Sequence, residues 1–187
     1  SGENYVSKLY KMNMDGTGLA ELQEYEPSVL PSGQEGRSYI SSLSIDNEGS
    51  LWITDSIFLY HIDEKGFYVD DGRRIYLRKL NADGTELSRA DISQLAEGNE
   101  YFEIGAMTID GGNRIYITNG DNCVYALDSE GKLLFTLESA NWVNALVTLS
   151  DGSAAGMTYD NGLKVKKIDV NSQTWGENYP LLISAIS

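Results

Sequence analysis

The segment SLSIDNEGSLWIT, at residues 42–54, gives the clearest indication of the fold. Apolar and polar residues alternate on both sides of a short polar turn, which is the period-two pattern of half-buried strands. The pattern occurs again without a gap as AMTIDGGNRIYIT at 106–118, and a third copy, ALVTLSDGSAAGM, occurs at 145–157. Each copy therefore predicts a strand, a turn and a second strand.

A second signature follows each copy and also predicts strand, turn and strand. It occurs as KLNADG at 79–84, ALDSEG at 126–131 and KIDVNS at 167–172, and a further instance, KMNMDG, stands at 11–16. Glycines after Asp or Asn in such turns supply the positive φ that tight hairpins need. Joined, the two signatures give four consecutive antiparallel strands per repeat, which is typical of a β-propeller blade.

The spacing of the repeats locates one insertion. Asp46 and Asp110 are 64 residues apart, whereas Asp110 and Leu149 are 39 apart, an excess of 25 residues in the first full blade. We assign the excess to residues 56–74 and expect a long hairpin between the second and third strands. In the alternative interpretation, residues 60–66 are a degenerate extra copy of the second signature.

The predicted fold is therefore all-β, with about three and a half blades of four antiparallel strands in one domain over residues 1–187. The parts are a half-blade at 4–24, blades at about 38–92, 101–138 and 141–180, and the start of a further strand at 181–187. Closed propellers have roughly four to eight blades. Either the last strand completes a four-bladed ring with the half-blade, or the chain is a fragment of a larger ring, which we favour. A short helical turn is expected at 92–98.

Charge and hydropathy exclude several partners. The net charge of −14 argues against a nucleic-acid backbone or an anionic bilayer. No apolar run reaches the roughly 18 residues that a membrane span needs, so no direct membrane insertion is expected. Cys123 is the one cysteine and is predicted to be a small buried hydrophobe.

Few residues of the sequence are of the types that act as catalytic nucleophiles or metal ligands. His61 is the one histidine, and we expect it to be an exposed cross-strand residue of the insertion. One histidine and one cysteine do not make a zinc site. Oxygens two residues apart, as at 46–49, resemble calcium loops, but such side chains mostly bond their own backbone. We therefore predict no enzyme, no cofactor and no metal.

A ligand is expected at the loops that precede the innermost strands and those that follow the second strands, which share one propeller face. The predicted ligand-binding residues are Tyr39, Asp55, Glu103, Asn119, Asp121, Trp142, Asn144 and Asp160. Aromatic rings beside Asp and Asn suit a glycan or a protein partner. The alternative is that the aromatics pack between blades and the polar residues only turn the chain. Trp52 and Tyr116, at equivalent strand positions, are predicted to be core.

An enzymatic alternative uses the same face. A propeller hydrolase or lactonase would hold a metal at the central channel, and the polar residues that could line its mouth are Asp55, Asn119, Asp121 and Asp160. No glutamate accompanies them there. A metal-dependent turnover would distinguish this alternative from a non-catalytic binding or scaffold module.

The repeats resemble known propeller families. The Asn-x-Asp-Gly-Thr turns at 13–17 and 81–85 resemble TolB-like repeats, and the pattern at 45–53 is similar to NHL and two-component-regulator repeats. The stretch 39–180 resembles the propeller-like N-terminal region of extracellular solute-binding lipoproteins of gut Firmicutes. That resemblance implies an extracellular protein anchored at the cell surface through a region outside this chain, and a link to carbohydrate or solute capture beside the solute-binding domain of an ABC importer.

Overall fold

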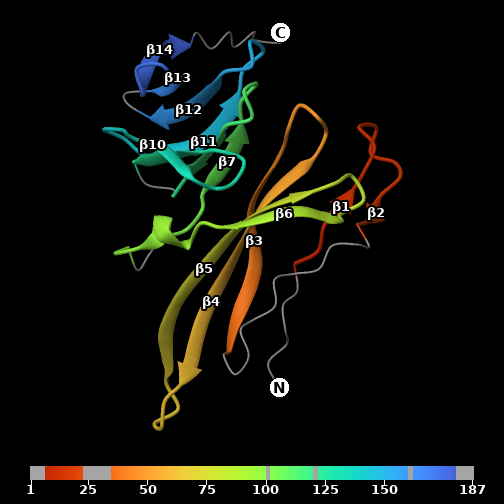
Figure 1. The fold of residues 1–187 in the computed structure, drawn as a ribbon, viewed down its shortest axis with the longest axis vertical. Coiled ribbons are helices and arrows are strands. Elements are labelled where there is room, and N and C mark those ends of the chain that lie inside the picture. The colour runs from red at the N-terminus through yellow and green to blue at the C-terminus, as the bar shows by residue number, and fades with distance from the viewer. Residues whose placement is uncertain (1–6, 23–34, 100–101, 120–121, 160–161, 180–187) are drawn as a thin grey trace. The chain divides into compact units, whose positions relative to one another are not determined.

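The computed structural model describes residues 7–22, 35–99, 102–119, 122–159 and 162–179. It divides into two compact units, Ser1–Phe102 (unit 1) and Glu103–Ser187 (unit 2). Regular structure in the described ranges is almost wholly β-strand, in four-stranded antiparallel sheets (Figure 1). This confirms the predicted all-β class and the blade-like sheets.

Unit 1 contains one four-stranded sheet in which each strand pairs with the next along the chain. Its strands are β3 (Glu35–Ile45), β4 (Leu51–Ile62), β5 (Tyr68–Leu80) and β6 (Glu86–Asp91). A two-stranded sheet of β1 (Tyr10–Lys11) and β2 (Ala20–Glu21) lies in the predicted half-blade. The short 3-10 helix η1 (Ser93–Ala96) lies where a helical turn was expected.

Unit 2 contains two sheets of the same meander topology. The first consists of β7 (Ala106–Ile109), β8 (Ile115–Thr118), β9 (Cys123–Leu127) and β10 (Leu133–Glu138). The second consists of β11 (Val143–Thr148), β12 (Ala154–Tyr159), β13 (Leu163–Asp169) and β14 (Thr174–Tyr179). The strand expected at 181–187 lies outside the described residues.

The insertion forms one long hairpin. β4 pairs with β5 from Leu51↔Leu80 out to Ile62↔Tyr68, and β3 follows β4 as far as Glu35↔Tyr60. β6 pairs only with the segment of β5 from Tyr76 onwards. The β4–β5 hairpin therefore extends past β6 and a little past β3, as the strands labelled β4 and β5 in Figure 1 show. This is the first of the two interpretations of residues 56–74.

The two sheets of unit 2 pack face to face, with β7 beside β11. The shared core contains Tyr116, Val124, Ala126, Phe135, Leu137, Val143, Leu146, Ala154 and Ile168. Thr108 and Thr148 join the first strands through their hydroxyls at 2.8 Å, and Gly111 N–H donates to the Gly152 carbonyl at 2.6 Å. A Cβ at Gly111 would lie 3.3 Å from the Gly152 backbone, so glycine allows this close approach of the two turns.

The turn between the first and second strands explains the repeated Asp-and-aromatic pattern. Asp46 Oδ1 accepts hydrogen bonds from two turn amides, at 3.0 and 2.8 Å, and its Oδ2 accepts the Trp52 indole N–H at 2.9 Å. Asp110 makes the same contacts, with the Tyr116 hydroxyl donating at 3.0 Å. Both rings are buried, as predicted, because each polar tip reaches a carboxylate.

Among the described residues, no helix has the length and apolar character needed to cross a membrane.

Candidate functional site

Four of the predicted ligand-binding residues lie at one end of unit 2, where β7 and β11 begin and β8 ends. Glu103 precedes β7, Asn119 follows β8, Trp142 precedes β11, and Asn144 is the second residue of β11. Backbone and side-chain contacts hold these strand ends together. Gly105 N–H donates to the Thr118 carbonyl at 2.7 Å, and the Thr118 hydroxyl donates to the Val143 carbonyl at 3.4 Å. We call this region the Trp142 end.

An exposed row of three large side chains forms at the Trp142 end. The register pairs Val143 with Thr158 and Tyr159 with Leu163, so Trp142 directly precedes and Tyr159 directly follows the last paired residues of β11 and β12. Val143 and Thr158 are buried, so their neighbours Trp142 and Tyr159 project away from that core. Trp142 and Tyr159 are each 67% exposed, and Leu163 is 49% exposed. We call these three residues the aromatic row.

Sequence reasoning identified Trp142 but missed the other two residues of the aromatic row. Both follow from pairing register, which hydrophobic alternation within one strand does not reveal. The signal that could have identified Tyr159 is its position directly after Thr158, the counterpart of Thr54 and Thr118 at the end of a predicted strand.

The remaining polar residues of this end differ in exposure. Glu103 and Asn144 are exposed, and Asn119 is half-buried. Asp121 and Asp160 lie outside the described residues. Cys123 is half-buried on the β9 face opposite Val124, so the prediction that it is buried was wrong. The exposed polar residues among these predicted ligand-binding residues thus offer the carboxylate of Glu103 and the amide of Asn144.

The structure corrects the loop positions predicted for Tyr39 and Asp55 in unit 1. Both lie inside strands, because the insertion lengthens β3 and β4 past the point where a shorter blade would turn. Tyr39 is half-buried and stacks on Phe58, with the ring centroids 5.5 Å apart and the Arg73 guanidinium 4.1 Å from the Phe58 centroid. The Tyr39 ring therefore packs against the β4–β5 hairpin.

Asp55 belongs to a buried ionic network. Its carboxylate accepts the Ser38 hydroxyl at 2.8 Å and an Arg78 Nη1–H at 2.9 Å, and both charged side chains are almost fully buried. Arg78 also contacts Glu86 at 2.6 Å. Burial alone would raise the pKa of Glu86, but hydrogen bonds from Arg89 and Arg78 outweigh it and lower that pKa. The network joins the four strands of the sheet, and it keeps the Asp55 carboxylate buried and out of reach of a ligand.

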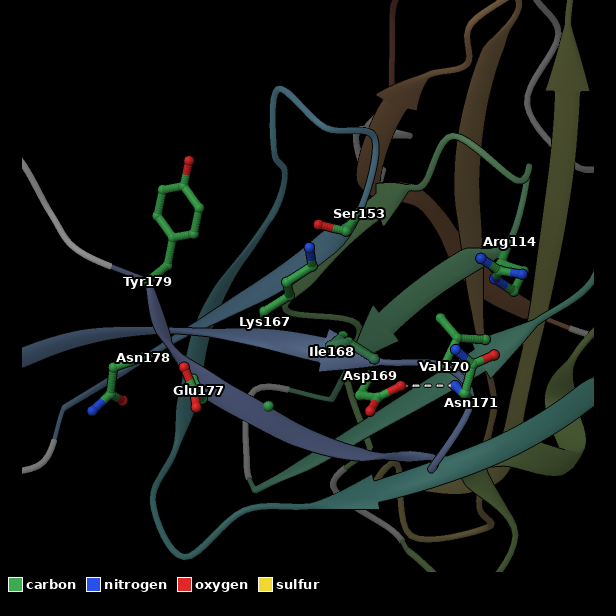
Figure 2. Close-up of a pocket in the computed structure, with 11 residues that line it drawn as sticks. Arg114, Ser153, Lys167, Ile168, Asp169, Val170, Asn171, Glu177, Asn178 and Tyr179 are labelled. Atoms are coloured by element: carbon green, nitrogen blue, oxygen red, sulfur yellow. Dashed lines mark hydrogen bonds between the residues drawn. The ribbon is translucent and has the colours of Figure 1, made fainter.

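A groove that the sequence did not predict lies along β13 and β14, with a volume of about 790 Å³. Figure 2 shows its lining. It starts near the turns at the opposite end of the strands from Trp142. Its cations already have partners, since Arg114 contacts Asp110 and Lys167 contacts Asp151, at 2.8 and 2.6 Å. The contact with Lys167, with help from Ser153, holds the pKa of Asp151 below its usual range.

The aspartates in the turns accept hydrogen bonds from backbone amides of the same turns. In each of Asp46, Asp63, Asp110 and Asp128, one carboxylate oxygen accepts amide hydrogen bonds from residues two and four positions ahead. Within the described ranges, no group of three His, Cys, Asp or Glu side chains could hold a metal ion. The acidic residues whose spacing resembles that of calcium loops therefore stabilise turns here, through hydrogen bonds to backbone amides.

Comparison with known proteins gives no family. No protein-family model and no curated protein matches the chain. The chain is similar in structure to a protein of unknown function from Bacteroides caccae, with a TM-score of 0.47, 12% identity, and coverage of 96% of this chain and 71% of that one. A luciferin-regenerating enzyme gives 0.39 and 12%, with coverage of 91% and 69%. Kuenenia stuttgartiensis hydrazine synthase gives 0.43 and 12%, with coverage of 81% and 51%, so the chain spans about half of that protein.

Proposed function

We propose that the chain is a non-catalytic binding module that holds a neutral carbohydrate at the Trp142 end. The observation that carries the proposal is the exposed aromatic row, in which Trp142 and Tyr159 adjoin the Val143↔Thr158 pair of β11 and β12 and are each 67% exposed. Large exposed rings gathered at one place mark interaction sites. The apolar face of a sugar ring can stack on them while its hydroxyls stay hydrated.

Nearby polar groups supply specificity for hydroxyls. Asn144 offers two donors and an acceptor, and Glu103 offers a carboxylate, both from exposed positions. The net charge of −14 disfavours acidic polysaccharides, which would be repelled over the whole surface. A neutral sugar is therefore the ligand class that best fits this end.

The openness of the surface favours binding over turnover. A ligand on side chains that are 67% exposed keeps much of its water. Catalysis by preorganised charge needs a site from which water is excluded. We therefore expect weak, metal-independent binding. The resemblance to the propeller-like region of solute-binding lipoproteins supports a location at the cell surface, next to a partner domain that captures solutes.

The test is calorimetric titration with a panel of neutral oligosaccharides, with and without a chelator. Wild type should bind, and Trp142→Ala and Tyr159→Ala should each weaken binding at least tenfold while the far-ultraviolet spectrum stays unchanged. Phe67→Ser, an equally exposed aromatic in unit 1, is the matched control and should bind like wild type. Equal binding by all four proteins would contradict the proposal.

The enzymatic alternative makes a different prediction. A metal at a channel mouth would give turnover of a lactone, glycoside or ester that depends on added divalent ions. Turnover that disappears in Asn119→Ala or Asp160→Ala would overturn the binding-module proposal.

A further inference from the structure

The insertion of unit 1 carries a feature that the blade does not need. β6 pairs with β5 only from Tyr76 to Leu80, so the segment around residues 60–71 lies beyond the four-stranded part of the sheet. We call residues 60–71 the hairpin tip. Figure 1 shows it as the far end of the β4–β5 hairpin. Its side chains add little to the core of unit 1, so another role is needed to explain their character.

The hairpin tip carries exposed apolar side chains on both faces, with Ile62 and Tyr68 on one face and Val69, 37% exposed, on the other. Ile62 pairs with Tyr68 and His61 pairs with Val69, so these two pairs point to opposite faces of the ribbon. Phe67 and Tyr68 are 67% and 70% exposed, and Ile62 is 51% exposed. A surface that lies flat on a partner needs only one apolar face. Apolar groups on both faces fit insertion into a cleft that closes around the ribbon.

The hairpin tip is also held in one conformation. Asp63 Oδ1 accepts the amides of Lys65 and Phe67, both at 2.9 Å, and Gly66 takes the positive φ of +84° that the turn requires. The rings of Tyr60 and Tyr68 meet edge to face at 5.1 Å. In the same hairpin tip, His61 Nδ1 lies 2.8 Å from a carboxylate oxygen of Asp71. A preorganised tip loses little conformational entropy when it binds.

The charge of the hairpin tip indicates which kind of partner it would bind. The acidic residues of the hairpin tip are Asp63, Glu64, Asp70 and Asp71, against the one lysine, Lys65. An anionic bilayer or a nucleic acid would repel such a tip, whereas lysine and arginine around a cleft would attract it. We propose that the hairpin tip docks into an apolar cleft, rimmed by Lys and Arg side chains, on a partner protein.

The first test places a photo-cross-linking phenylalanine analogue at position 67 of the full-length protein in the cells that make it. Position 142 carries the same analogue as the matched control. The expected result is one cross-linked protein, specific to position 67, whose modified peptide lies in an apolar cleft flanked by lysine or arginine. Cross-links to lipid, to a second copy of the chain, or to the same products as position 142 would overturn the proposal, as would the absence of any cross-link.

The second test uses charge and does not depend on the sugar site. Glu64→Lys combined with Asp70→Lys should weaken binding to the identified partner at least tenfold, and added salt should weaken binding by the wild type. Glu130→Lys, in an equivalent exposed turn of unit 2, should have no effect. A charge reversal without effect would contradict the proposal. Phe67→Ser should lose the partner yet keep carbohydrate binding, whereas Trp142→Ala should do the reverse, so failure of either proposal is recognisable.

Discussion

At the scale of single residues, one carboxylate joins the first turn to the strand that follows it in two of the three four-stranded sheets. Asp46 accepts hydrogen bonds from two turn amides, from the Trp52 indole and from the Lys79 ammonium, the last at 3.0 Å. Burial alone would raise the pKa of Asp46, but these hydrogen bonds outweigh it and lower the pKa below 3.8. The turn, the ring and the third strand thus depend on one ionised group.

Two replacements of Trp52 separate the contribution of ring packing to stability from that of the hydrogen bond between its indole N–H and Asp46. Trp52→Ala should cost about 3–5 kcal/mol of the free energy of unfolding, because it leaves a cavity and removes one hydrogen bond from the Asp46 carboxylate. Trp52→Phe keeps most of the volume and should cost about 1–3 kcal/mol less than the alanine change. Urea unfolding of both variants measures the difference. A cost below about 1 kcal/mol for Trp52→Ala would show that the ring is not core.

The lowered pKa of Asp46 predicts how stability depends on pH. The folded state binds its proton less readily than the unfolded chain, so this contribution is complete above about pH 5. It is lost as the pH falls through the folded-state pKa, which lies below 3.8. Asp46→Asn should therefore lower stability at pH 7 and make the unfolding midpoint less dependent on pH between about 5 and 3. An unchanged acid dependence in the variant would contradict this role.

At the scale of elements, alternation and turn chemistry are local, so sequence alone predicts the blade-like sheets, the long hairpin and the turn near residue 95. Asp55 shows where such reasoning ends. The equivalent strand β8 ends at Thr118, which placed Asp55 in a loop, but the insertion carries β4 on to Ile62. Its partner Arg78 lies on another strand. Pairing across strands, like that of Tyr159 with Leu163, depends on register and not on local pattern.

The hairpin provides a prediction at this scale. Tyr60 and Asp70 are direct Cα partners, so an Asn-Gly turn can replace residues 61–69 between them. Stability should change by less than about 1 kcal/mol, because the removed side chains are mostly exposed. His61→Ala should likewise cost less than about 0.5 kcal/mol, since its pair with Asp71 is exposed. Loss of cooperative unfolding in the shortened chain would show that the hairpin tip supports the sheet.

At the scale of the whole molecule, the three tryptophans report on three different environments. Trp52 donates its indole N–H to Asp46, Trp175 donates to the Glu138 carbonyl at 2.8 Å, and Trp142 is mostly exposed at the proposed binding end. Each indole N–H gives its own signal in a nitrogen-correlated NMR spectrum. The chain therefore contains one probe at the proposed site and two internal references.

The most direct measurement is a titration of these three indole signals with the neutral oligosaccharide panel. Binding at the Trp142 end predicts that the Trp142 signal shifts and saturates with at least one oligosaccharide, with or without chelator. The signals of Trp52 and Trp175 should stay in place. A Trp142 signal that does not move with any oligosaccharide, or shifts confined to Trp52 and Trp175, would contradict the assignment of the carbohydrate site to this end.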